Sequence, residues 1–377
     1  VQAIVRAVST AGGQLVAAGL GAHRELGAPP DRIDVLVQLD RLSRIVDHQA
    51  ADMTATVEAG CSLATLGAAL ATAGQWLPLD PPHPATTTVG GLVAANLSGP
   101  LRASHGTARD LVIGLKIVGF DGALVAGGGR VVKNVAGYDL PKLHIGALGT
   151  LGIVVEVSWK VRPRPAAEAA VVIACGSTEA AAEWALQMRD LVEPCWLEAA
   201  GARGLLAEFG TEPAVVVGLA GLPEEIDAQR AAVLAATQRG ALATMLVADG
   251  AALRARLADF PTQPATAVLR CATLPTGVGA IMHTAERTAA MAGGTARCLA
   301  HAVSGVVTIA LDGDAAVAPT ITALRALVAT TNGSVVIDRA PPAVKITHDT
   351  YGPLGEGAAL MRAIRAQFDP QTVFAPR

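Results

Sequence analysis

Aromatic residues and long hydrophobic runs are scarce in this chain of 377 residues. Aromatic side chains make up only 3% of the sequence, so its core must be mainly aliphatic, with alanine, glycine and valine prominent. No uninterrupted apolar run reaches the roughly 18 residues that a membrane-spanning helix needs. Hydrophobic residues amount to 51% and charged residues to 16%, which is a globular composition. The sequence therefore predicts a folded protein without a transmembrane segment.

Cysteine pairs and a basic stripe are also missing. The formal net charge is −3 and both signs are interspersed, so we expect no nucleic-acid partner. None of the cysteines forms a C-x-x-C pair, which argues against a zinc or iron–sulfur centre built by this chain alone. We expect reduced, buried thiols in a cytoplasmic protein, and no apolar signal-peptide core follows the first residues. The cysteines are Cys61, Cys175, Cys195, Cys271 and Cys298.

The residue composition and the pattern of predicted elements change at Pro163–Ala167, where we place a domain boundary. Before it, glycines cluster and short β-branched runs alternate with helices. Gln2 to Thr10 predicts a helix, and Asp121-Gly122 predicts the tight turn of a hairpin. Beyond the boundary, strands alternate with alanine-rich helices, which indicates an α+β domain with helices on one face of an antiparallel sheet.

Three segments of the first region are suited to binding a phosphorylated cofactor. Gly19-Leu20-Gly21-Ala22-His23 follows a strand, and its small residues let backbone N–H groups converge on an anion. A glycine-rich surface turn is the alternative for this segment alone.

The second segment, Thr86 to Gly99, places hydroxyls before a glycine pair at a predicted helix start. Such a start favours phosphate, although a helix start with packing glycines remains the alternative. The third segment, Gly127 to Val154, mixes glycines with polar side chains in a way that no simple packing rule explains. The chain has neither G-x-G-x-x-G after its first strand nor G-x-x-x-x-G-K-[ST], so a Rossmann site or a P-loop is disfavoured.

In this order and spacing, the three segments resemble the FAD domain of the vanillyl-alcohol oxidase/PCMH superfamily, and within it the FAD-binding subunits of glycolate oxidase complexes. Gly129 to Ile153 is the most specific stretch, and the ending Phe368-Asp369-Pro370 also fits. The resemblance implies an α+β protein: a PCMH-type FAD-binding fold of two subdomains over 1–165, an α+β cap domain over 166–335, and a C-terminal segment over 336–377 that returns to the FAD domain.

The resemblance also implies roles for individual residues. Those that would hold the pyrophosphate are Gly19, Leu20, Gly21, Ala22 and His23. Those that would wrap the pyrophosphate and the ribityl chain are Pro81, Thr87, Thr88, Val89, Gly90 and Gly91. Asn96, Ser98 and Gly99 would line the flavin side, Gly106 and Asp110 would lie beside the cofactor, and Gly149, Gly152 and Ile153 would bring backbone against adenosine or flavin. Lys133, Asn134 and Tyr138 would lie near the isoalloxazine, or else brace their own loop.

The sequence departs from catalytic relatives in the cap domain. They carry H-A-G-D-G-N-x-H, whereas this chain has His301-Ala302-Val303-Ser304-Gly305-Val306-Val307-Thr308. One remaining histidine is a poor metal site, so we expect no metal and interpret His301 as a structural histidine. Arg270 could clamp a carboxylate or form a structural ion pair, so both residues are weak catalytic candidates.

Two further expectations concern the cofactor and its partners. Gly21 occupies the place in the turn where relatives attach flavin through a histidine, so we expect non-covalent FAD. The resemblance implies an FAD-carrying subunit of a 2-hydroxyacid dehydrogenase complex with a sister flavoprotein and an iron–sulfur subunit, cytoplasmic or held at the inner membrane by its partners. A self-sufficient FAD oxidoreductase and a scaffold that has lost FAD are the alternatives.

Overall fold

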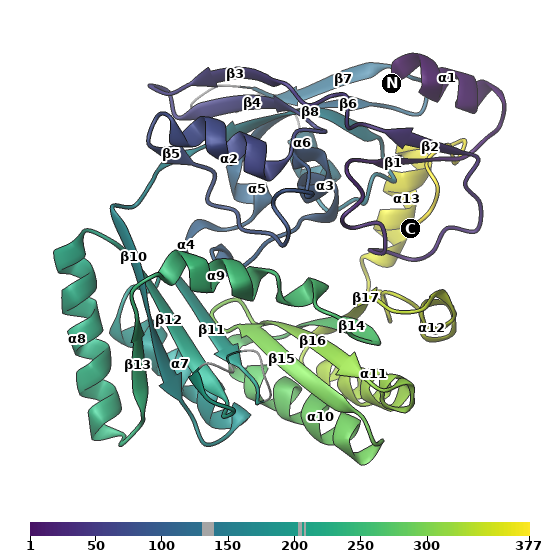
Figure 1. Cartoon of the computed structure of the whole chain (residues 1–377). Coiled ribbons are helices and arrows are strands. Elements are labelled where there is room, and N and C mark those ends of the chain that lie inside the picture. Colours follow the sequence, from purple (N-terminus) through teal and green to yellow (C-terminus); the bar gives the residue numbers. More distant parts are fainter. Residues whose placement is uncertain (130–138, 203–205, 207–208) are drawn as a thin grey trace. The chain divides into compact units, whose positions relative to one another are not determined.

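The computed structural model describes residues 1–129, 139–202, 206 and 209–377. The chain divides into two compact units. Unit 1 comprises Val1–Ser98, Gly106–Arg164 and Leu354–Arg377, and unit 2 comprises Gly99–His105 and Pro165–Pro353. Each unit has its own large sheet (Figure 1).

Unit 1 is built on a five-stranded antiparallel sheet. Its strands, in spatial order, are β3 (Ile45–Gln49), β4 (Thr54–Glu58), β8 (Ile153–Lys160), β6 (Val112–Val118) and β7 (Leu124–Gly128). The core includes the fully buried side chains of Val57, Val157 and Trp159. Residues of Leu63–Ala71 and Val89–Ala95, the helices that follow β4, also belong to it. The helices of this part are α2 (Leu63–Ala71), α3 (Val89–Ala95), α5 (Ala108–Leu111) and α6 (Leu140–His144), and the short strands β5 (Gln75–Trp76) and β9 (Arg162–Pro163) pair with each other.

The two ends of the chain meet in unit 1. Helix α1 (Gln2–Thr10) buries Val5 and Val8 beside the parallel pair β1 (Leu15–Ala18) and β2 (Val35–Gln38). After helix α13 (Ala358–Phe368) the chain runs beside β1, where Leu15 donates its N–H to the carbonyl of Val373 and accepts one from Ala375. Asp369 fixes this return, because its buried carboxylate accepts the N–H groups of Val373 and Phe374 at 2.8 and 2.9 Å.

Unit 2 contains an eight-stranded sheet whose neighbouring strands are all antiparallel. The strands, in spatial order, are β13 (Thr244–Val247), β10 (Ala167–Ala174), β12 (Ala214–Gly221), β11 (Trp196–Ala200), β15 (Thr295–His301), β16 (Val306–Asp312), β14 (Ala267–Ala272) and β17 (Ser334–Arg339). One face carries the aliphatic core beneath α7 (Thr178–Leu191), α8 (Pro223–Arg239), α10 (Val278–Met291) and α11 (Asp314–Ala329) (Figure 1). The sequence-based prediction of an antiparallel sheet with a helical face is confirmed.

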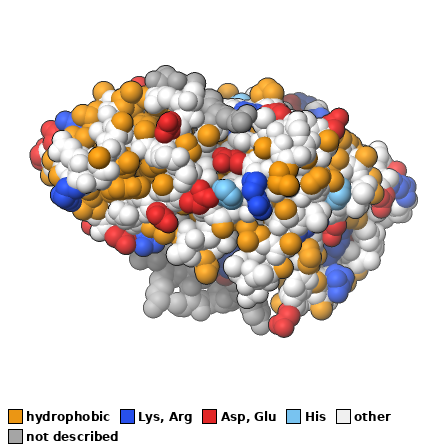
Figure 2. All heavy atoms as spheres, turned by 90° about the horizontal axis from the view of Figure 1, so that it is seen from below, with side chains coloured by type: hydrophobic (Ala, Val, Ile, Leu, Met, Phe, Trp, Pro, Cys, Tyr) orange, Lys and Arg blue, Asp and Glu red, His pale blue; other side chains and the backbone are white. Residues whose placement is uncertain are grey.

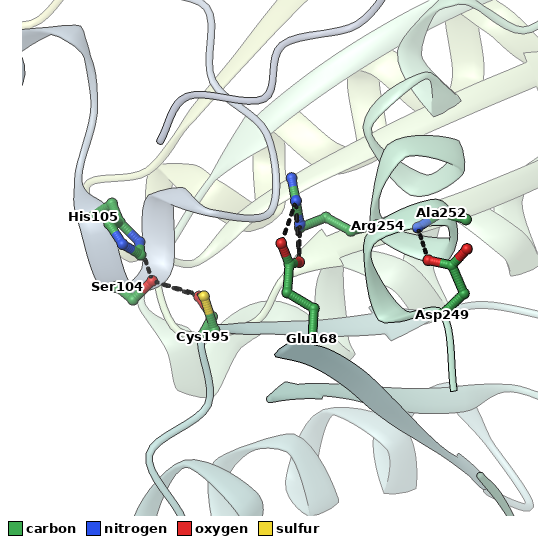
Figure 3. Close-up of polar contacts among 7 residues, drawn as sticks. All are labelled: Ser104, His105, Glu168, Cys195, Asp249, Ala252 and Arg254. Carbon is green, nitrogen blue, oxygen red and sulfur yellow. Dashed lines mark hydrogen bonds and ion pairs between the residues drawn. The ribbon is translucent and has the colours of Figure 1, made fainter. Parts of the chain in front are cut away.

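The opposite face of that sheet is partly covered by α9 (Gly250–Ala258), which the ion pair between Arg254 and Glu168 of β10 ties down at 3.1 Å. The short segment with α4 (Arg102–His105) also belongs to unit 2, because the hydroxyl of Ser104 donates to the carbonyl of Cys195 at 2.5 Å. Figure 3 shows both contacts. Unit 2 also contains α12 (Pro342–His348) and one-turn 3₁₀ helices at Phe260–Thr262 and Pro275–Gly277.

The C-terminal boundary lies later than the sequence predicted. We placed the return to the FAD domain at residue 336, but β17 pairs with β14 in the sheet of unit 2. The chain rejoins unit 1 only at Leu354. The helix at Gln2–Thr10 and the hairpin around Asp121-Gly122 are confirmed.

The distribution of charged side chains and the state of the cysteines are as expected from the sequence. On the face in Figure 2, acidic and basic side chains are interspersed among hydrophobic ones. All the cysteines are buried and unbridged, as the sequence predicted. In the described part of the chain no helix has the length and apolarity to span a bilayer.

Candidate functional site

Unit 1 contains a pocket that brings together segments far apart in the sequence. It lies at the end of β1, beside α3, and at the start of β8. Its lining residues are Ala17–Arg24, Leu39, Ala59, Thr86, Thr88, Gly90, Gly91, Ala94, Ala95, His144, Ala147–Gly149, Gly152–Val154 and Arg377.

Glycines let two of these segments approach each other closely. A Cβ on Gly19 would lie 2.2 Å from Oγ1 of Thr88, so only glycine fits there. The same Thr88 hydroxyl accepts the N–H of Gly91 at 3.2 Å. Gly90 packs closely against Ala59, the residue after β4, because a Cβ added at Gly90 would lie 2.8 Å from the Cβ of Ala59. The result is a cradle of small residues and backbone, which suits a pyrophosphate.

The turn after β1 is held by side-chain contacts. Gly21 has φ +88°, a conformation that disfavours other residues. Nε2 of His23 lies 2.7 Å from the hydroxyl of Thr87, which is fully buried and donates to the carbonyl of Pro82. Burial, and secondarily the charge of His83, lower the pKa of His23 to about 4. His23 is therefore neutral at pH 7.

The opposite wall is formed by the loop between α6 and β8. Leu148 donates its N–H to the carbonyl of Ala94 at 2.8 Å, which fastens this loop to the last turn of α3. Gly149 has φ +75° with open space where a Cβ would be. Gly152 is tightly enclosed, since a Cβ there would lie 2.6 Å from Cγ2 of Ile117. Backbone thus borders the pocket directly on this side.

One cation reaches the turn from the C-terminal segment. The guanidinium of Arg377 donates to the carbonyl of Arg24, and both residues line the pocket. Positive charge beside a glycine-rich turn favours a bound anion. The glycine cradle and the positive charge suit the pyrophosphate of FAD, and the apolar wall at Ile153 and Val154 suits its planar rings. The pocket therefore fits FAD.

The structure gathers many of the predicted cofactor residues in this pocket. Those that line it are Gly19, Leu20, Gly21, Ala22, His23, Thr88, Gly90, Gly91, Gly149, Gly152 and Ile153. Thr87 and Val89 are buried next to it in sequence. Pro81, Asn96, Ser98 and Gly106 are not among its lining residues, and Gly99 belongs to unit 2. Lys133, Asn134 and Tyr138 lie outside the described residues. Contact of any of them with FAD stays a prediction.

Asp110 has a local structural role. Its carboxylate accepts the N–H of Thr107 at 2.8 Å and forms the capping box at the start of α5. Gly106, with φ +79°, precedes this cap, and a Cβ there would collide with the same carboxylate. The capping turn accounts for this glycine and acid without a ligand.

The sequence missed several lining residues. Ala94, Ala95, His144 and Ala147 lie within the second and third segments but were assigned no role. Leu39, Ala59 and Arg377 lie outside all three segments. His144 is 5% exposed, and burial lowers its pKa to about 4. The glycine-rich turn pattern indicated residues 19–23 but not Arg377. Arg377 reaches the pocket only because the C-terminal segment runs back beside β1.

The two weak catalytic candidates both lie in unit 2 and have partners there. Arg270 on β14 donates two hydrogen bonds to the carboxylate of Asp338 on β17, from Nε to Oδ2 at 2.9 Å and from Nη2 to Oδ1 at 3.1 Å. Nδ1 of His301 on β15 lies 2.8 Å from Oε1 of Glu198 on β11. Glu198 is fully buried, which raises the pKa of its carboxyl, while His301 and Arg102 oppose that rise. Within the described ranges no group of three metal-ligating side chains is present.

Comparisons with known proteins identify what the chain is similar to. Residues 1–128 match the family described as FAD binding domain. The chain is 39% identical to glycolate oxidase subunit GlcE of Escherichia coli (strain K12) over 49% of its own length and 53% of the relative's. It is 32% identical to glycolate oxidase subunit GlcD of Bacillus subtilis (strain 168), over 45% of this chain and 36% of that one. The matches thus span about half or less of these relatives.

The fold has a solved counterpart. An alkyldihydroxyacetonephosphate synthase structure superimposes with a TM-score of 0.71 at 18% identity, covering 100% of this chain and 74% of the synthase. Such a low identity supports the fold alone. The predicted fold class and the prediction that the cofactor is FAD are both confirmed by these comparisons, and its non-covalent attachment stays a prediction. Residues 1–128 thus match an FAD binding domain, the cofactor of the chain is FAD, and part of the chain is similar to glycolate oxidase subunits.

Proposed function

We propose that this chain is the FAD-carrying subunit of a multisubunit glycolate or 2-hydroxyacid dehydrogenase complex. A sister flavoprotein oxidises the hydroxyacid, an iron–sulfur subunit takes the electrons onward, and this chain supports the assembly or relays electrons through its own FAD. The similarity to both GlcE and GlcD supports this arrangement. The complex would lie in the cytoplasm or at the inner membrane through its other subunits.

The observation that carries the proposal is the contrast between the two units. Unit 1 offers a pocket whose glycines, backbone and cation suit FAD. In unit 2, by contrast, both catalytic candidates bond to acids of their own sheet, Arg270 to Asp338 and His301 to Glu198. A guanidinium fork already occupied by a carboxylate is poorly disposed to clamp a second one. This supports a subunit that carries FAD and does not itself oxidise substrate.

Bound FAD would supply the two-electron redox chemistry, and the protein's part is to hold and shield it. The turn at Gly19–His23 and the cradle at Thr88–Gly91 would fix the pyrophosphate. The imidazole of His23 is neutral, so the positive charge beside the turn comes from Arg24 and Arg377, which both line the pocket. The apolar wall at Ile153 and Val154 would exclude water from a ring of the cofactor.

We also propose that FAD is bound without a covalent link. Gly21 has no side chain to attach to flavin, and His23 holds Thr87. Precipitating the purified protein with trichloroacetic acid tests this directly. Yellow colour in the supernatant is expected, whereas colour that stays in the pellet would contradict non-covalent binding.

A second candidate function is a self-sufficient FAD-dependent oxidoreductase acting on a hydroxyacid or another alcohol. It is favoured by the Glu198–His301 pair, because a carboxylate that holds Nδ1–H of a histidine leaves Nε2 as a base. In this reading His301 would remove the hydroxyl proton of the substrate.

Stopped-flow reduction separates the two candidates. The isolated chain, reconstituted with FAD, is mixed with glycolate or D-lactate and followed at the flavin band. We expect negligible bleaching by the isolated chain and activity in the co-expressed complex, which His301→Ala changes little. Rapid bleaching that His301→Ala abolishes would refute the subunit proposal and establish the self-sufficient enzyme.

A further inference from the structure

His144 is a buried histidine at the wall of the FAD pocket. It is the last residue of α6, and its side chain is among the buried polar groups at 5% exposure. Its ring makes an edge contact with Phe368, with centroids 5.9 Å apart and planes at 80°. Its Cε1 lies 3.7 Å from the place where a Cβ of Gly152 would be. The imidazole is thus wedged between two walls and borders the pocket.

The hydrogen-bonding capacity of this ring is not met by the part of the chain that the structure describes. A neutral imidazole carries one N–H donor and one acceptor nitrogen. Among residues 1–129, 139–202, 206 and 209–377, no side chain or backbone group bonds to either nitrogen of His144. Most other histidines do bond to a described side chain, namely His23, His48, His105, His283 and His301.

A buried polar group without a partner is costly, and such groups are normally satisfied by a ligand or by ordered water. The rest of the wall here is apolar, formed by Leu148, Ile153 and Val154. One polar atom set among aliphatic side chains is the usual arrangement for orienting a planar heterocycle. The phosphates have a separate place, the glycine cradle at Gly19 and Thr88.

We propose that His144 is an FAD-binding residue that donates a hydrogen bond from its imidazole N–H to an acceptor on one of the two ring systems of FAD, adenine or isoalloxazine. The proposal rests on the FAD pocket and not on the hydroxyacid function. Both ring systems are planar and carry nitrogen acceptors, so the chemistry of recognition is the same. Burial lowers the pKa of the imidazole to about 4, so at pH 7 the ring is neutral and has one N–H to donate.

The test compares His144→Met with His144→Gln in the full chain. Methionine fills a similar volume without a donor, whereas glutamine restores an N–H. FAD is titrated into the apoprotein, and the quenching of flavin fluorescence gives the dissociation constant. We expect about tenfold weaker binding for His144→Met and recovery to within about threefold for His144→Gln. Thermal melting of both apoproteins verifies that they fold.

Two control variants make the outcome decisive. His48→Met changes a histidine of unit 1 that bonds to Gln75 outside the pocket, and it should leave FAD binding unchanged. Gly21→Val distorts the pyrophosphate turn and should reduce FAD binding. Unaltered affinity in His144→Met, with loss in Gly21→Val, would overturn the role of His144 and leave the pocket assignment intact. Unaltered affinity in both would overturn the pocket assignment itself, and the proposal with it.

Competition by fragments identifies the ring system. ADP and FMN are each used to displace FAD from the wild type and from His144→Met. If the variant binds ADP more weakly but FMN as well as the wild type does, the hydrogen bond is to adenine. If it binds only FMN more weakly, the hydrogen bond is to the isoalloxazine. If the variant weakens neither fragment nor FAD, the imidazole is only a packing group.

Discussion

The hydroxyl oxygen of Thr87 lies 2.7 Å from Nε2 of His23 and 2.7 Å from the carbonyl oxygen of Pro82. A hydroxyl has one hydrogen, and a carbonyl can only accept, so Thr87 donates to Pro82. Its oxygen must therefore receive the bond from His23, which fixes the proton on Nε2 and leaves Nδ1 as an acceptor. The lowered pKa of His23, caused first by burial, is consistent with this neutral tautomer.

Thr87→Val should loosen the pyrophosphate turn. The substitution keeps the shape but leaves the Nε2–H of His23 and the carbonyl of Pro82 without their partner, at a cost of about 1–3 kcal/mol. We expect a lower urea midpoint and reduced FAD content, measured as flavin absorbance against protein. Thr72→Val is the matched control, because that hydroxyl is exposed and bonds only within its own turn to Ala69. Equal behaviour of the two variants would contradict the link between Thr87 and the turn.

Gly152→Leu should cost both stability and FAD. A side chain there meets Ile117 at 2.6 Å and the carbonyl of Val118 at 3.1 Å, so overpacking of about 1–3 kcal/mol is expected. Thermal melting with and without added FAD measures both effects. Gly67→Leu, at a helical site with no atom within 4 Å of its Cβ, should be tolerated. A drop in melting temperature that is identical with and without FAD would show that Gly152 serves packing alone.

Asp369→Ala should detach the C-terminal return from β1. The carboxylate is 3% exposed and accepts two backbone N–H groups, so its loss orphans two buried donors at about 2 kcal/mol or more. Asp369→Asn keeps one acceptor oxygen and should lose less. Urea denaturation compares both with Asp121→Ala, whose carboxylate caps an exposed turn. If Asp369→Ala and Asp369→Asn both lowered the free energy of unfolding no more than Asp121→Ala does, the role of this carboxylate would be contradicted.

The protein should become less stable between pH 7 and pH 5, in part because of His144. Burial lowers the pKa of this imidazole from 6.5 to about 4, so in this window the unfolded chain takes up a proton that the folded chain does not. Stability therefore falls as pH falls, by at most about 2 kcal/mol for this group over the interval. His23, with its pKa also near 4, acts in the same direction.

The measurement is the urea midpoint at pH 7 and at pH 5, without FAD. Carboxyls such as Glu58, whose pKa is lowered by Arg44, contribute at more acidic pH. His144→Met removes one titrating group, so the difference between the two midpoints should shrink. A variant with the full wild-type pH dependence would show that His144 does not contribute in this way.

Much of the local structure could be read from the sequence. Asp121-Gly122 specified a hairpin turn, Ser62 specified the start of α2, and proline at 163 specified a boundary, because each acts on the backbone of its own or neighbouring residues. The glycine-rich turn at residues 19–23 identified one wall of the pocket for the same reason. Hydrophobic patterning also indicated a sheet with one helical face in the second unit.

Only the tertiary structure decided which of these local features meet. Gly19 must be glycine because Thr88 lies against it, and Glu198 lies beside His301 although 103 residues separate them. The membership of β17 in the second sheet depends on its pairing with β14, which moved the boundary from 336 to Leu354. Contacts of this kind arise from strand register and burial, which involve distant segments, so no local pattern contains them. His144 is the clearest case, since its neutral, buried ring beside the pocket follows from the packing of α6, Gly152 and Phe368 together.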